Sequence, residues 1–70
     1  MLDTITRNRL LRLPEVRERT GKSRSAIYRE IRAGSFPRQL ALGPRTAAWS
    51  EAEVSEWINA RIHARDGARA

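Results

Sequence analysis

The sequence has no cysteine and one histidine, and Lys22 is the single lysine among its 14 basic residues. The absence of cysteine excludes disulfides, thiolate zinc sites and cysteine nucleophiles. His63 alone cannot form a catalytic histidine dyad or a zinc site. No apolar run approaches the roughly 20 residues that span a bilayer, and residues 1–6 do not resemble a secretory signal. We therefore expect a cytoplasmic protein that is not an enzyme and has no cofactor, metal, small-molecule ligand or membrane partner.

Negative charge is also scarce relative to positive charge. The 70 residues contain 14 Lys and Arg but only 8 Asp and Glu, which gives a net charge of +6. Such an excess favours a polyanionic partner, and the guanidinium group suits phosphates and guanine edges. A chain of this length forms one domain with a small core, because it buries only about 60% of its unfolded surface.

Two short helices joined by a glycine-containing turn are predicted in the first half of the chain. Pro14 is typical of a helix start and Gly21 of a helix end, which predicts a helix over 14–20. Ser23 suits the N-cap of a second helix over 24–33, which another glycine ends. Two helices with such a joint are the sequence form of a helix-turn-helix.

The second helix has two chemically different sides. At 100° per residue, Ile27 and Ile31 share a narrow apolar stripe that should face the core. A separate arc of about 100° carries hydroxyl and guanidinium groups, those of Ser25, Tyr28, Arg29 and Arg32. Arginine reads guanine edges and hydroxyl groups bind phosphates, while Ser23 and Arg24 lie at the helix end that attracts anions. The pattern predicts a helix that enters a DNA major groove; the alternative is a solvated surface of good helix formers.

A hairpin is predicted next. Residues 38–42 and 45–49 flank Gly43-Pro44, a typical turn pair. Alternation predicts one apolar face, formed by Leu40, Leu42, Ala47 and Trp49. Arg38 on one arm and Arg45 just past the turn would give a basic wing that contacts DNA, although edge arginines also discourage strand pairing and a plain loop is the alternative.

One further element is predicted before the two helices and another after the hairpin. Residues 9–13 are expected to form an edge strand or an extended lead-in. A capping box, Ser50 to Glu53, should begin a third helix over 51–64. Its core-facing stripe is predicted to contain Val54, Trp57, Ile58 and Ile62. The domain therefore spans 9–64, between a flexible N-terminus (1–8) and a frayed tail (65–70).

Several segments together resemble the AlpA family of small prophage regulators, which are related to excisionases and to MerR proteins. The resemblance covers about residues 10–62 and rests on these segments in order: Arg12-Leu13-Pro14-Glu15-Val16, Thr20 to Arg29, Gly34-Ser35-Phe36-Pro37, Leu42-Gly43-Pro44-Arg45, Trp49 and Glu53 to Ile58. It implies a small α+β winged helix-turn-helix, mainly helical, with three helices and a two-stranded wing. The family's recognition helix falls on Ser23 to Arg29 and its wing arginine on Arg45. Lys22 departs from the family, which more often has an apolar residue there; the lysine would loosen packing or add a phosphate contact.

The resulting hypothesis is a sequence-specific regulator of a prophage or other mobile element that binds double-stranded DNA, with an integrase or neighbouring copies of itself as further partners. The predicted contact residues are Ser23, Arg24, Ser25, Tyr28, Arg29, Arg32, Arg38 and Arg45. Two alternatives stay open. The protein could be an excisionase, a recombination directionality factor that bends attachment-site DNA with an integrase. It could also be an interaction module or antirepressor whose basic surface meets an acidic protein.

Overall fold

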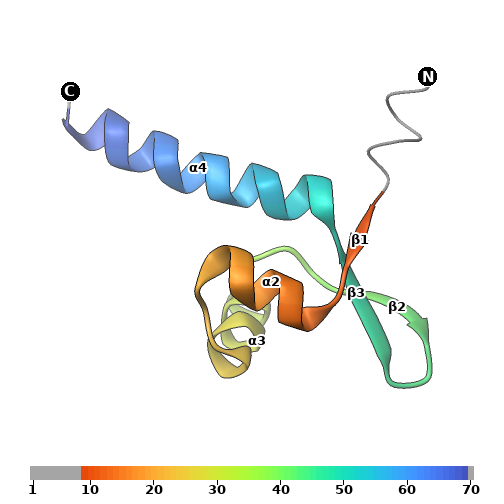
Figure 1. The fold of residues 1–70 in the computed structure, drawn as a ribbon. Helices are drawn as coiled ribbons and strands as arrows, with labels where there is room; N and C mark the ends of the chain where they lie inside the picture. Colours follow the sequence, from red (N-terminus) through yellow and green to blue (C-terminus); the bar gives the residue numbers. More distant parts are fainter. Residues whose placement is uncertain (1–8, 70) are drawn as a thin grey trace.

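A computed structural model describes residues 9–69, so the prediction for residues 1–8 lies outside the described part of the chain. Its elements follow one another in the order β1 (Leu10–Leu11), α2 (Leu13–Thr20), α3 (Arg24–Ala33), β2 (Leu40–Gly43), β3 (Thr46–Ser50) and α4 (Glu51–Arg69). Figure 1 shows α4 crossing above α2 and α3, while the β2–β3 hairpin extends away from the helices.

The two short helices have the predicted caps. The Ser23 hydroxyl accepts a hydrogen bond from the Ala26 N–H at 3.1 Å, as an N-cap serine should. Gly21 and Gly34 end the helices with φ of 72° and 81°, a backbone conformation that favours glycine. α2 begins one residue earlier than predicted, at Leu13, with Pro14 in its first turn. The ends of both helices therefore follow local signals in the sequence.

The sheet contains three antiparallel strands in the order β1-β3-β2, so the lead-in is a true strand that joins the hairpin. The predicted apolar face of the hairpin is wrong. Leu40 pairs with Ala48 and Gly43 pairs with Thr46, so the same stretch of the hairpin contains one more residue on β2 than on β3. The extra residue, Leu42, forms a β-bulge that shifts the pairing register by one residue. Leu40 and Leu42 consequently remain 44% and 53% exposed. We call the β2–β3 hairpin, residues 40–50, the wing.

The last helix is longer than predicted. One of the two hydrogen bonds of its capping box is present, because the Glu53 N–H donates to the Ser50 hydroxyl at 3.3 Å. α4 continues to Arg69, whereas the sequence predicted its end at residue 64. Val54 is fully buried, but Ile62 is 42% exposed, because this part of α4 extends past the body of the domain. The predicted core-facing stripe therefore ends before Ile62.

The core lies between the helices and the sheet. Its buried members come from every element except β2, and they are Leu11, Val16, Ile27, Phe36, Ala48, Trp49 and Val54. Leu13, Tyr28, Ile31, Trp57 and Ile58 pack against the cluster and are partly buried. The indole N–H of Trp49 donates to the Pro37 carbonyl at 3.1 Å, so the largest core residue also fixes the loop before β2. Over residues 9–69, no helix is long and apolar enough to cross a membrane.

Candidate nucleic-acid interface

The isoleucines of α3 face the core, as expected, and leave the opposite side of the helix open. Ile27 is fully buried, and Ile31 is partly buried against the same cluster. Ser25, Arg29 and Arg32 are all exposed. The helix is thus anchored on one side and presents a hydroxyl and two guanidinium groups on the other. We call Ser25, Arg29 and Arg32 the outer arc of α3.

The electrostatics of α3 separate its one acid from its arginines. Glu30 forms ion pairs with Lys22 and, at 3.8 Å, with Arg61. The hydrogen bond from Lys22, together with the nearby positive charges, holds the pKa of Glu30 below its ordinary value, although partial desolvation opposes the shift. Among the described residues, no ion pair neutralises Arg24, Arg29 or Arg32. The outer arc therefore keeps its positive charge available.

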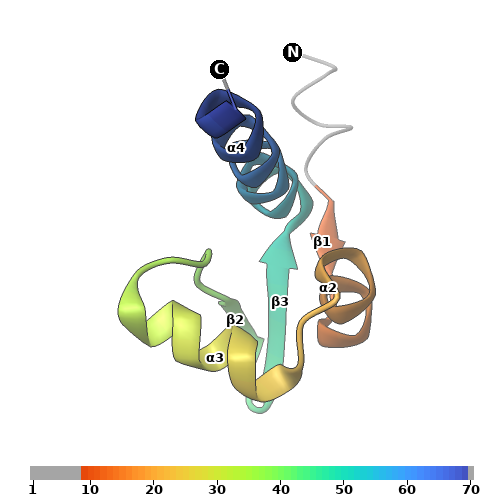
Figure 2. The ribbon, with the colours of Figure 1, turned by 90° about the vertical axis from the view of Figure 1, so that its left-hand side faces the viewer.

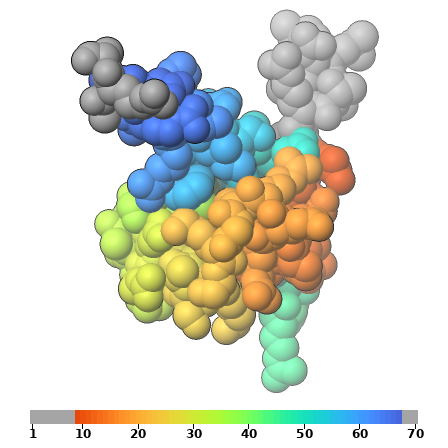
Figure 3. Space-filling view, turned by 60° about the vertical axis from the view of Figure 1, so that its left-hand side comes forward, coloured from red at the N-terminus to blue at the C-terminus, as the bar shows by residue number. Residues whose placement is uncertain are grey.

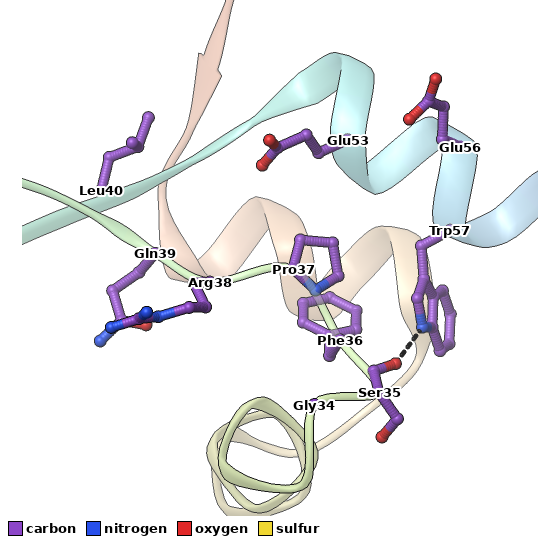
Figure 4. A pocket seen from close by; sticks show the side chains of 10 residues that line it. All are labelled: Gly34, Ser35, Phe36, Pro37, Arg38, Gln39, Leu40, Glu53, Glu56 and Trp57. Carbon is purple, nitrogen blue, oxygen red and sulfur yellow. Dashed lines mark hydrogen bonds between the residues drawn. The ribbon is translucent and has the colours of Figure 1, made fainter.

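Lys22 belongs to a cluster that joins the turn, α3 and α4. The Lys22 ammonium lies 5.6 Å from the centroid of the Trp57 ring, and the Arg61 guanidinium carbon lies 4.8 Å from it. The Trp57 indole N–H donates to the Ser35 carbonyl at 2.7 Å (Figure 4). The lysine charge, at a position where the family more often has an apolar residue, is therefore paired within the protein, with Glu30 and the Trp57 ring.

Tyr28 is shared between the core and the surface. Its ring packs edge-on against Trp49, with the ring centroids 6.0 Å apart. The Arg24 guanidinium carbon lies 5.1 Å from the centroid of the Tyr28 ring. Tyr28 thus packs α3 against the core and also contacts Arg24. The position of Tyr28 on the helix surface did not predict this structural role.

The structure brings three of the predicted contact residues together in one hollow of about 390 Å³, which we call the arginine hollow. Arg24 and Tyr28 of α3 and Arg45 of the wing line it. Arg12, which sequence reasoning did not single out, lines it as well. The wing projects beside α2 and α3, as Figures 2 and 3 show. Pairing of β1 with β3 places Arg12 next to the wing, a long-range contact without a local sequence signal.

Arg45 and Arg38 are placed differently from the prediction. Arg45 occupies the turn itself, with a positive φ of 57°. Arg38 precedes β2 rather than lying in a strand, and it lines a different groove, together with Glu53, Glu56 and Trp57 (Figure 4). The structure therefore does not bring Arg38 together with Arg24 and Arg45. Ser23 is exposed, and its hydroxyl oxygen accepts the capping hydrogen bond from Ala26, which leaves its O–H as a donor.

A helix-turn-helix followed by a β-hairpin wing defines this chain as a small α+β winged helix-turn-helix protein. The chain belongs to the AlpA family, described as prophage CP4-57 regulatory protein (AlpA), which matches residues 9–62. It is 48% identical over 64 residues to "Uncharacterized protein ORF88" of Enterobacteria phage P4, covering 91% of this chain and 73% of that protein. It is 39% identical over 59 residues to "DNA-binding transcriptional activator AlpA" of Escherichia coli strain K12, covering 76% of this chain and 84% of that protein.

Proposed function

We propose that this protein is a sequence-specific transcriptional regulator of a prophage or other mobile element, and that it inserts α3 into the major groove of double-stranded DNA. The observation that carries the proposal is the outer arc of α3, which is exposed and has no ion-pair partner among the described residues. The name of the E. coli relative, a DNA-binding transcriptional activator, supports the same function. The protein would act as a regulator rather than an enzyme, on DNA in the cytoplasm.

The proposal assigns roles by chemistry. Arg29 and Arg32 are the candidates for base edges, because guanidinium groups donate two hydrogen bonds to guanine. Ser23, Ser25 and Tyr28 suit phosphate oxygens, and Arg24, Arg38 and Arg45 suit the neighbouring backbone. One short module covers few base pairs, so neighbouring copies on adjacent sites are proposed to supply useful affinity.

The test is a salt series of binding between the full chain and the DNA around its own gene and the adjacent attachment site. A shuffled duplex of the same length and composition is the control. We expect tighter binding to the native duplex and a linear fall of log K with log salt, with a slope of about −0.9 for each neutralised phosphate. Equal affinity for both duplexes would contradict sequence specificity. Binding without salt dependence would contradict a phosphate-lined partner and favour an interaction module.

A functional assay separates regulation from recombination. We expect a promoter reporter from the same region to respond to the protein while excision by the integrase is unchanged. Excision that depends on the protein, with an unresponsive reporter, would instead identify an excisionase that works with an integrase.

A further inference from the structure

The arginine hollow lies where three separate parts of the chain meet: the residue before α2, the first half of α3, and the wing. Arg12, Arg24 and Arg45 supply three guanidinium-bearing side chains to one hollow, and none of its lining residues is acidic. All three arginines are exposed, and no described carboxylate forms an ion pair with them. Five other described basic residues have acidic partners, namely Arg9, Arg19, Lys22, Arg61 and Arg65, whereas Arg17, Arg29, Arg32 and Arg38 form no ion pair among the described residues but do not line the hollow.

Two aromatic rings that pack against each other line the hollow. Trp49 lines it and is fully buried, and the Tyr28 ring packs edge-on against Trp49. Arg24 in turn lies over the Tyr28 ring. The arginine of α3 is therefore positioned by stacking before any ligand arrives, which lowers the entropy cost of binding.

We propose that the arginine hollow binds one phosphodiester group of the DNA strand that passes between α3 and the wing, and that Arg12 is a binding residue for it. Three positive charges without a nearby carboxylate repel one another, and an anion between them removes that repulsion. Guanidinium groups bind phosphate oxygens in a two-pronged geometry. This inference rests on the proposed function, because the hollow is flanked by the helix and the wing that would contact the duplex.

The first test compares Arg12→Gln with Arg65→Gln. Arg65 carries the same charge but lies on α4 and pairs with Asp66 at 2.9 Å, outside the hollow. Loss of a charge-assisted hydrogen bond should weaken DNA binding by Arg12→Gln about tenfold. The salt slope should become shallower by about 0.9, because one fewer phosphate is neutralised. Arg12→Lys should recover the slope but only part of the affinity, and Arg65→Gln should change neither.

A second test identifies the bound group. Single phosphates of the duplex are replaced, one at a time, by uncharged methylphosphonates. At one position the replacement should weaken binding of the wild type but leave binding of Arg12→Gln unchanged, because that variant has already lost the contact. Titration with inorganic phosphate, followed by the NMR signals of Arg12 and Tyr28, distinguishes a free anion from the DNA backbone. Saturation at millimolar phosphate without such a methylphosphonate position would overturn the assignment to DNA.

The two proposals can fail separately. If the wild type binds its duplex and Arg12→Gln matches it in affinity and salt slope, the hollow is not a phosphate site and the proposed function stands. If the wild type does not bind duplex DNA, the proposed function fails and the inference fails with it. Thermal melting of each variant confirms that the exposed substitutions leave the fold intact.

Discussion

Lys22 in the turn donates a hydrogen bond to the carboxylate of Glu30 in α3, and this pair ties the joint of the helix-turn-helix to the middle of its second helix. Both side chains are mostly buried, with 22% and 19% of their surface exposed. Arg61 approaches the same carboxylate from α4 and covers the Trp57 ring. The acid of α3 thus joins the turn, α3 and α4, and its ion pairs are with Lys22 and Arg61 rather than with the outer arc.

The first prediction concerns the pH dependence of this pair. The Lys22 hydrogen bond is the chief reason that the pKa of Glu30 in the folded protein lies below its ordinary value, so the charged form stabilises the fold. That contribution is complete above the unfolded pKa and disappears as pH falls through the folded pKa. We expect the wild type to melt at a higher temperature than Glu30→Gln at pH 7, and the difference to shrink at pH values below about 4.3, the ordinary pKa of a glutamate.

Melting curves across this pH range check the prediction. Glu56→Gln is the matched control, because Glu56 is exposed and has no ion pair within residues 9–67. Its melting temperature at pH 7 should differ from that of the wild type by a small amount, because an exposed side chain without an ion pair contributes little to stability. If the difference in melting temperature between the wild type and Glu30→Gln stays the same down to low pH, the fold does not stabilise the charged form of Glu30.

The second prediction concerns the anchored side of α3. Ile27 is fully buried, whereas Ile62 on α4 is 42% exposed. Ile27→Ala leaves a cavity and should lower the free energy of unfolding by about 2–5 kcal/mol, a large share for so small a domain. Ile62→Ala should change it by less than about 0.5 kcal/mol. Chemical denaturation measures both free energies of unfolding. Equal effects of the two substitutions would contradict the burial of Ile27 in the core or the exposure of Ile62 on α4.

Local signals predicted the elements well because helix ends depend on neighbouring residues. Ser23 caps α3 through its hydroxyl group, and Gly21 and Gly34 adopt the left-handed conformation that glycine tolerates because it has no Cβ. The end of α4 was predicted at residue 64, but the helix continues through Gly67 to Arg69. Glycine costs a helix interior only about 1 kcal/mol, so a helix can continue past it.

The errors that matter for the site come from pairing between strands. A bulge at Leu42 changed which side chains share a face of the wing, and alternation within one strand carries no information about the register. Arg12 reaches the arginine hollow only because β1 pairs with β3. The family resemblance included Arg12 in its first motif but gave it no role. Side chains on one helix could be grouped from the sequence, whereas groupings across elements needed the fold.

The third prediction concerns base recognition by the outer arc. If Arg29 reads a base edge, Arg29→Ala should cost about 1–3 kcal/mol on the native duplex and relax specificity at one base position. A set of duplexes with single base-pair changes measures this, with Arg65→Ala as the control that removes a charge from α4. A uniform loss across all duplexes would make Arg29 a phosphate contact, and an unchanged affinity would remove it from the interface.

The fourth prediction separates stability from binding at the tip of the wing. Arg45 is the one non-glycine residue with positive φ in the described chain, at 57°. Glycine adopts this conformation without the roughly 1–2 kcal/mol cost of an L side chain, but it loses about 0.5–1 kcal/mol of backbone entropy on folding. Arg45→Gly should therefore leave the free energy of unfolding unchanged or raise it by up to about 1 kcal/mol. The same change removes a guanidinium group from the arginine hollow, so DNA binding should weaken while stability is preserved. Thermal melting and DNA titration of the same sample check both halves, and a stable Arg45→Gly protein with wild-type affinity would exclude the wing tip from the interface.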